Sequence, residues 1–306
     1  MGKRKIILLC LAVFLLAVYA FQIASSRKNT VRELTLSEDI STITLSCKEN
    51  GEITLTKNAD GWKVGKYTAN ESKASQIAEQ IKSIKILDTV SSSANDASLY
   101  GLDEANVITV KAWAGEQLLR TMEIGKASVT GSQTYIRLDG EKAVGLASGS
   151  LAALFSSTAE QLRDNSIYSF ASADIEKVVS RSSAGNFAVM RLPAASEDGA
   201  AEWALLTESG EIDTEQSVDS AKVASWVSSI AILNASDWTD ESDTTPLDAQ
   251  TTLEITAKGK TISVNIAAKG ADDTYTTECS ESPYRFKITQ YAGGNLSKTL
   301  EELQAQ

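Results

Sequence analysis

An internal repeat constrains the fold of this chain more than any other feature of its sequence. Segments of similar sequence recur in the same order, 141 to 146 residues apart. They pair Trp62 with Trp203, Ser83–Leu87 with Ser229–Leu233, Gly101–Asp103 with Pro246–Asp248, and Gly149–Leu151 with Gly294–Leu296. A nearly constant offset over four matches predicts two copies of one structural unit.

Each predicted copy begins with a hairpin and continues through a helix into further strands. Asn50-Gly51 lies between two alternating runs, as a tight turn with positive φ requires. After the predicted N-cap Asn70, apolar residues at helical spacing indicate an amphipathic helix that ends in Ile84–Leu87. A short helix, at 150–162 or 296–303, closes each copy. This order predicts an α+β fold with mainly antiparallel sheets.

The first 28 residues are predicted to form an uncleaved signal anchor. Ile6–Phe21 is an uninterrupted apolar run of 16 residues, preceded by three basic residues, Lys3 to Lys5. This length suits a membrane-spanning helix better than a secretory segment, although cleavage near Ala20 or Ser26 is the alternative. The basic tip predicts a cytoplasmic N-terminus, so the chain is expected to be a single-pass protein of the cell membrane with its bulk outside the cytoplasm.

These features predict the division of the chain into segments. They are a signal anchor or transmembrane segment at 1–28, a linker at 29–40, a first α+β repeat at 41–165, a short link at 166–172, and a second, diverged α+β repeat at 173–306.

Composition excludes several classes of function. The chain has no histidine, so Ser-His-Asp triads, Cys-His nucleophiles and histidine-bound zinc are excluded. The residues beyond the anchor hold all 40 acidic residues but only 24 of the 29 basic ones. Such a body will not bind nucleic acid through counterion release. No cofactor and no metal are expected.

The chain resembles the domain of unknown function 4340 family. The resemblance depends on Gly61-Trp62, on Glu123-Ile124-Gly125, and above all on two further elements, Tyr100-Gly101-Leu102-Asp103 and Leu162-Arg163-Asp164. The second copy carries Thr245 and Pro246 in place of the first tyrosine and glycine. The resemblance implies a bacterial, membrane-anchored protein of unassigned activity, often encoded beside an ABC-type, gliding-motility-like transport system.

The signature residues are interpreted as structural. Gly101 supplies a turn, Leu102 packs inward and Asp103 satisfies the turn, whereas a ligand site with Asp103 as acceptor is the less favoured hypothesis. Trp62, Gly125, Arg163 and Asp164 belong to the same set. Trp113 and Trp238 are predicted as exposed contacts.

Other candidate chemistry is weaker. The acidic run Asp237–Asp248 suggests calcium, but Ser242 occupies the position where a calcium loop needs glycine. Gly259-Lys260-Thr261 lacks the upstream glycine of a phosphate loop. Cys47 and Cys279 are expected to be separate thiols, with a disulfide between the copies as the alternative.

We therefore expect a non-enzymatic, membrane-tethered module that binds a protein partner in the envelope, with ABC-type transporter subunits as the partner that the resemblance implies. One alternative is a solute-binding domain with a ligand cleft between the repeats. A second is a carboxylate-based hydrolase of surface polymers.

Overall fold

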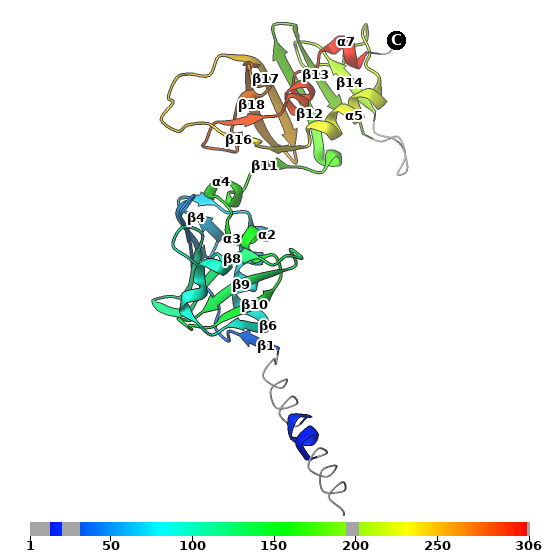
Figure 1. The fold of residues 1–306 in the computed structure, drawn as a ribbon. Coiled ribbons are helices and arrows are strands. Elements are labelled where there is room, and N and C mark those ends of the chain that lie inside the picture. Colours follow the sequence, from blue (N-terminus) through cyan, green and yellow to red (C-terminus); the bar gives the residue numbers. More distant parts are fainter. Residues whose placement is uncertain (1–12, 20–30, 194–201, 305–306) are drawn as a thin grey trace, which may run out of the picture. The chain divides into compact units, whose positions relative to one another are not determined.

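The computed structural model describes residues 13–19, 31–193 and 202–304 (Figure 1). The chain divides into two compact units, Met1–Asp164 and Asn165–Gln306, here called unit 1 and unit 2. Both are built from antiparallel strands with a few short helices, so the predicted α+β class is confirmed.

Unit 1 contains one ten-stranded sheet in which every neighbouring pair is antiparallel. Its order is β1-β6-β10-β9-β8-β7-β2-β3-β4-β5. The strands are β1 (Arg32–Thr35), β2 (Thr42–Cys47), β3 (Gly51–Asn58), β4 (Gly61–Val64), β5 (Tyr67–Thr68), β6 (Ser83–Ser91), β7 (Ile108–Ala114), β8 (Gln117–Ala127), β9 (Gln133–Leu138) and β10 (Val144–Ser148). The helices are α2 (Glu71–Lys82), η1 (Ala94–Tyr100), α3 (Leu151–Phe155) and α4 (Ala159–Leu162).

Unit 2 contains an eight-stranded sheet, β14-β13-β12-β17-β18-β19-β20-β16, and a separate pair, β11-β15. The strands are β11 (Ser166–Ser169), β12 (Ile175–Ser182), β13 (Gly185–Arg191), β14 (Trp203–Leu206), β15 (Ile232–Asn234), β16 (Asp237–Trp238), β17 (Ala249–Ala257), β18 (Lys260–Lys269), β19 (Tyr275–Cys279) and β20 (Phe286–Ile288). The helices are η2 (Ser172–Asp174), α5 (Ser220–Ile230), α6 (Gln290–Leu296) and α7 (Leu300–Leu303).

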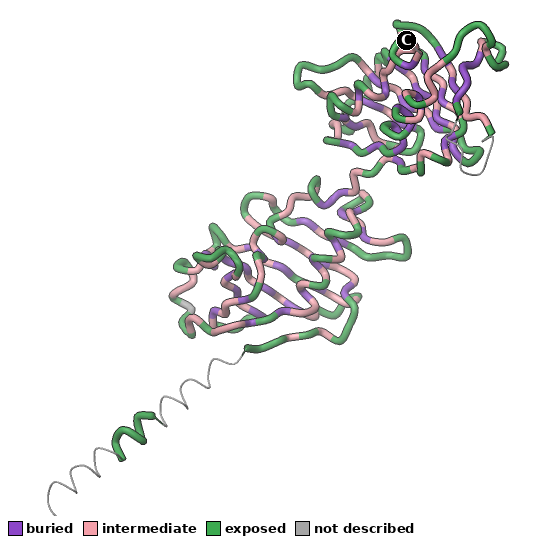
Figure 2. Tube along the Cα trace, turned by 90° about the vertical axis from the view of Figure 1, so that its right-hand side faces the viewer, coloured by how far each residue is buried: buried purple, intermediate pink, exposed green. Residues whose placement is uncertain are grey.

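Alternation along the strands gives each sheet one buried face. In β2, Ile43 and Leu45 are buried while Thr42 and Thr44 are half-buried, and the buried side chains join the core under α2 and α3. Figure 2 shows the same alternation of buried and half-buried residues along the strands. The opposite face, here called the outer face, is therefore polar.

The helix after the first hairpin begins as predicted and ends earlier. Asn70 is its N-cap and accepts a hydrogen bond of 3.1 Å from the amide of Lys73. The prediction that the helix ends in Ile84–Leu87 was wrong, because Ser83 is already extended and β6 begins there. Ile84 and Ile86 are buried and alternate with more exposed residues, which suits a strand as well as a helix end.

The closing helix of each unit is also shorter than expected. The predicted helix 150–162 is two helices, α3 and α4, and a capping box between Thr158 and Gln161 starts the second. The predicted helix 296–303 is likewise replaced by α6 and α7, with a capping box between Thr299 and Glu302. A capping box satisfies backbone amides at a new helix start and so stabilises the break.

Most of the predicted anchor lies outside the described residues. Residues 13–19 are helical, and the remainder of 1–28 is not described. Within residues 13–19, 31–193 and 202–304, no helix has both the length and the apolar character needed to cross a membrane.

Candidate functional site

The Tyr100–Asp103 signature forms a tight turn at the end of η1 in unit 1. Gly101 has φ of 70° and closes η1 in the left-handed region, which a side chain would strain. Leu102 is buried, as predicted. Asp103 accepts hydrogen bonds from the amide of Ala105 (3.1 Å) and from Asn106 Nδ2 (2.8 Å), so its Oδ1 is used within the turn.

Gly125 on β8 lets this turn lie directly against the sheet. A Cβ at Gly125 would be 2.2 Å from the carbonyl oxygen of Tyr100 and 3.1 Å from the Leu102 side chain. No side chain larger than hydrogen fits there without displacing the turn. The two signature elements, Tyr100–Asp103 and Glu123–Gly125, are thus the two sides of one packing contact.

Polar and aromatic contacts hold the same turn from β8 and β9. Arg137 donates to the carbonyl of Leu102 (3.3 Å) and forms an ion pair of 2.7 Å with Glu123. The rings of Tyr100 and Tyr135 lie 4.8 Å apart. These contacts fix the position of the turn on the sheet of unit 1.

The remaining signature residues also lie in structural positions. Trp62 is buried in the core of unit 1. The guanidinium of Arg163 stacks 3.8 Å from the centre of the Tyr67 ring, and the amide of Asp164 donates to the carbonyl of Thr68. The end of unit 1 is thereby fixed beside β5.

The two tryptophans that were predicted to be exposed, Trp113 and Trp238, are half-buried. Trp113 lies near the end of β7. Trp238 packs against the core cluster of unit 2, and its Nε1 donates to Asn165 Oδ1 over 2.9 Å.

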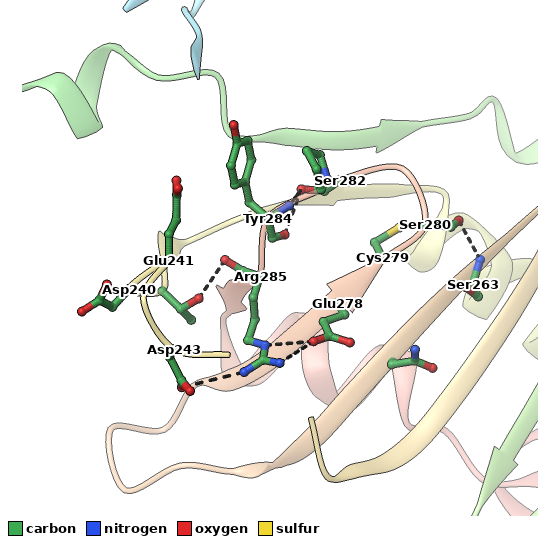
Figure 3. A pocket seen from close by; sticks show the side chains of 13 residues that line it. Asp240, Glu241, Asp243, Ser263, Glu278, Cys279, Ser280, Ser282, Tyr284 and Arg285 are labelled. Carbon is green, nitrogen blue, oxygen red and sulfur yellow. Dashed lines mark hydrogen bonds and ion pairs between the residues drawn. The ribbon is translucent and has the colours of Figure 1, made fainter. Parts of the chain in front are cut away.

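A polar pocket lies on the outer face of unit 2, over β18 and β19 (Figure 3). Its volume is about 530 Å³. The floor comes from β18 and β19, and the walls come from the acidic loop after β16 and from the turn before β20. Its lining residues are Thr239, Asp240, Glu241, Asp243, Ser263, Asn265, Glu278, Cys279, Ser280, Ser282, Pro283, Tyr284 and Arg285.

Arg285 links one wall of this pocket to its floor. Its Nε and Nη2 donate to Glu278 Oε1 over 2.9 and 2.6 Å, and Nη1 lies 3.8 Å from Asp243 Oδ2. Nη2 also donates to the carbonyl of Thr245 over 2.7 Å. The guanidinium donates three hydrogen bonds to the protein and lies beside two carboxylates, so its charge is paired and it braces the wall of the pocket against the floor.

The acidic run 237–248 is not gathered around a cation position. Asp240 accepts from the amide and hydroxyl of Ser242, and Asp243 accepts from the amide of Thr245. These hydrogen bonds lower the pKa of both carboxyls. In the part of the chain that the structure describes, no group of three or more acidic or cysteine side chains is placed to hold a metal ion.

The two described cysteines are free thiols. Cys279 is buried at the edge of the pocket, and burial raises the pKa of its thiol. A thiol held in its protonated form is a poor nucleophile. Cys47 is half-buried at the end of β2, where its Sγ accepts from the amide of Asn50 over 3.4 Å. The third cysteine, Cys10, lies outside the described residues.

Sequence reasoning missed Arg285, Glu278 and Asn265. Glu278 and Arg285 come from opposite sides of the β19–β20 connection, and Asn265 comes from the neighbouring strand. A cross-strand arrangement of this kind follows from register, which has no motif in the sequence.

A family model described as "Domain of unknown function (DUF4340)" matches residues 12–105 and, in a second overlapping match, residues 62–251. The two matches together cover well over half of the chain and include every signature residue named above. Comparison with curated proteins gave no match, and comparison with solved structures gave none.

Proposed function

This chain belongs to the DUF4340 family, a domain of unknown function, and we propose that it is a membrane-tethered, non-enzymatic module that binds a protein partner outside the cytoplasm. The observation that carries the proposal is the exposed apolar helix at residues 13–19. Phe14 and Leu16 there are 64% and 66% exposed, and all seven residues are exposed.

Exposed apolar side chains on a helix are unfavourable in water and are normally buried against another apolar surface. Residues 13–19 lie within the run Ile6–Phe21, which follows the basic residues Lys3 to Lys5. The length of this apolar run and the basic residues beside it fit burial in a lipid bilayer. The basic tip stays in the cytoplasm, and both units then lie on the other side of the membrane.

The state of the ionisable groups in the unit 2 pocket supports a binding role. A general acid needs a carboxyl with a raised pKa, whereas Asp240 and Asp243 have lowered pKa values. A cysteine nucleophile needs a lowered pKa, whereas that of Cys279 is raised. Asp240, Asp243 and Cys279 therefore lack the pKa shifts that a general acid or a thiol nucleophile needs.

The outer face of unit 1 supplies a surface for a protein partner. Six threonines from four adjacent strands project on this side, here called the threonine face: Thr42, Thr44, Thr54, Thr56, Thr109 and Thr121. Cross-strand register pairs Thr42 with Thr56 and Thr44 with Thr54. Threonine has few rotamers to lose and offers hydroxyl groups, so this surface can be covered at low entropic cost.

We also propose that the two units are copies of one ancestral unit. The order β4-β3-β2-β7-β8-β9-β10-β6 in unit 1 parallels β14-β13-β12-β17-β18-β19-β20-β16 in unit 2. Equivalent contacts support this view: the amides of Asn70 and Asp219, each a helix N-cap, donate to the carbonyls of Leu162 and Leu303.

Topology is tested by adding protease to intact cells. We expect digestion of both units while the basic tip survives. Protection of the units in intact cells, together with their digestion after lysis, would contradict the proposed orientation.

Partner binding is tested by a photo-crosslinking amino acid placed at Thr44 or Thr54 in the full chain. We expect crosslinks to a membrane protein, with subunits of an ABC-type transport system as the partner that family membership suggests. Gln76, exposed on α2 away from this face, is the matched control position. Crosslinks of equal yield from Gln76, or none from the threonine face, would count against the proposal.

A further inference from the structure

The floor of the unit 2 pocket presents two adjacent cross-strand pairs of polar side chains. Asn265 on β18 is paired with Glu278 on β19. Beside them, the amide of Ser263 donates to Ser280 Oγ (3.1 Å), and the amide of Ser280 donates to the carbonyl of Ser263 (3.0 Å). An amide, a carboxylate and two hydroxyl groups therefore line one side of the sheet.

Part of the hydrogen-bonding capacity of this floor is unused. Asn265 Oδ1 accepts from Thr252 Oγ1 over 3.0 Å, whereas its Nδ2 has no protein partner among the described residues. Glu278 Oε1 receives both hydrogen bonds from Arg285, and in the same described part of the chain Oε2 receives none. An unused donor, Asn265 Nδ2, and an unused acceptor, Glu278 Oε2, thus lie on neighbouring strands. The hydrogen bonds of Asn265 Oδ1 and Glu278 Oε1 hold the two side chains in place.

The walls of the pocket are fixed as well. The ring of Tyr284 lies edge-on to Trp238 with centroids 6.2 Å apart, and its backbone amide and carbonyl are both bonded to Ser282 Oγ. Figure 3 shows Tyr284 beside the acidic loop and Arg285 between Asp243 and Glu278.

The charge of the lining excludes one class of ligand. Four acidic side chains of the lining, Asp240, Glu241, Asp243 and Glu278, outnumber its one cation, Arg285, whose charge is paired with Glu278 and Asp243. A phosphate, sulfate or carboxylate would meet net negative charge and no unpaired cation. A neutral or amino-bearing ligand is compatible with this field.

Unit 1 differs at the corresponding place. The loop after β6 lies on its sheet, where Arg137 donates to the carbonyl of Leu102 and Tyr100 packs on Tyr135. In unit 2, Arg285 donates to the carbonyl of Thr245, but threonine and Pro246 stand where the signature has tyrosine and glycine. Without that tyrosine ring, the floor of the unit 2 sheet remains open.

We propose that the unit 2 pocket binds a neutral or amino-bearing saccharide. Vicinal hydroxyl groups each donate and accept hydrogen bonds, which matches the donor of Asn265 and the acceptor of Glu278. A volume of about 530 Å³ is of the size that small-ligand sites have. The site is distinct from the threonine face and does not depend on the proposed protein partner.

The test uses the full chain in detergent micelles and follows the Asn265 side-chain amide by NMR. The probes are the neutral N,N′,N″-triacetylchitotriose, the amino-bearing chitotriose and the neutral cellotriose, with a heparin-derived hexasaccharide as the anionic comparison and trilysine as the cationic peptide comparison. We expect a neutral or amino trisaccharide to shift the Asn265 amide signal and the anionic hexasaccharide to leave it unchanged. Preferential binding of the hexasaccharide or of trilysine would overturn the assignment, as would no response to any of the three trisaccharides.

Two variants test whether trisaccharide binding depends on the floor of the unit 2 pocket. Asn265→Asp keeps the shape of the side chain and removes its donors, and Ser280→Ala removes a hydroxyl at the neighbouring pair. We expect each to weaken trisaccharide binding about tenfold, followed by isothermal titration. Ser72→Ala, exposed on α2 of unit 1, is the matched control and should leave Kd unchanged. Unchanged Kd in both floor variants, or loss of binding in the control as well, would contradict the site.

Discussion

The guanidinium of Arg120 donates a hydrogen bond of 2.6 Å to the carbonyl of Ile81, in the last turn of α2. The same Nη1 donates to the carbonyl of Leu34 on β1 over 3.1 Å. Arg120 is 5% exposed, and burial lowers the pKa of its guanidinium. One buried cation therefore satisfies a helix end and holds the first strand of unit 1 against the sheet.

Arg120→Met should destabilise unit 1 by about 2–3 kcal/mol. Methionine fills the space of the arginine stem, but the two carbonyl groups lose a charged donor in a buried site. Hydrogen exchange of amides in β1 and α2 measures the effect. Arg181→Met is the control, since its pair with Glu254 is exposed and should contribute less than about 1 kcal/mol. An equal loss of stability in the Arg120 and Arg181 variants would show that the buried hydrogen bonds of Arg120 contribute no more than an exposed ion pair.

Gly125→Ala should destabilise unit 1 by about 1–3 kcal/mol. The added Cβ would lie 2.2 Å from the carbonyl oxygen of Tyr100, so the signature turn must move away from β8. The measurement is the hydrogen exchange of η1 and the turn. Ala127→Ser, two residues along the same strand and exposed, should stay within about 0.5 kcal/mol of the parent protein. Unchanged exchange in the turn of the Gly125 variant would refute the contact.

Local signals in the sequence were sufficient for several elements. Asn70 followed by apolar residues at helical spacing places the start of α2, and Asn50-Gly51 places the hairpin of β2 and β3. Both features are encoded within about a dozen neighbouring residues.

Boundaries and the pocket depend on distant contacts instead. Ile84 and Ile86 fit a helix or a strand, and pairing of β6 with both β1 and β10 selects the strand. In the pocket, Arg285 meets Glu278 because of the turn between β19 and β20, and Asn265 meets Glu278 because of register. Such register emerges only when the whole sheet is assembled.

Alanine substitutions at two adjacent glycines in α6 should change the stability of unit 2 in opposite directions. A Cβ at Gly293 would be 2.3 Å from the Tyr275 ring, whereas at Gly294 it would meet no atom within 4 Å. We expect Gly293→Ala to cost about 1–3 kcal/mol and Gly294→Ala to stabilise by about 0.5–1 kcal/mol. Pulsed alkylation of the buried Cys279 during urea unfolding measures unit 2 alone. A change of the same sign in the free energy of unfolding of both variants would contradict the packing of α6 on Tyr275.

Tyr168 should make unit 2 sensitive to alkaline pH. Its hydroxyl donates to the carbonyl of Ile230 over 3.0 Å in a buried site, and burial raises the pKa of the phenol far above its ordinary value of 10.0. In the unfolded chain the phenol ionises near pH 10, while in the folded unit it stays protonated. The stability is thus complete below about pH 10 and falls by about 1.4 kcal/mol per pH unit above it.

Tyr168→Phe removes this titration and separates it from that of other groups. At pH 7 the variant should be about 1–2 kcal/mol less stable, because the Ile230 carbonyl loses its donor. Between pH 10 and 11.5 the parent protein should lose stability faster than the variant, so the gap between them narrows. Urea unfolding at several pH values, followed by alkylation of Cys279, measures both slopes. Parallel slopes above pH 10 would mean that the Tyr168 phenol ionises in the folded unit as readily as in the unfolded chain, and hence that its site admits water.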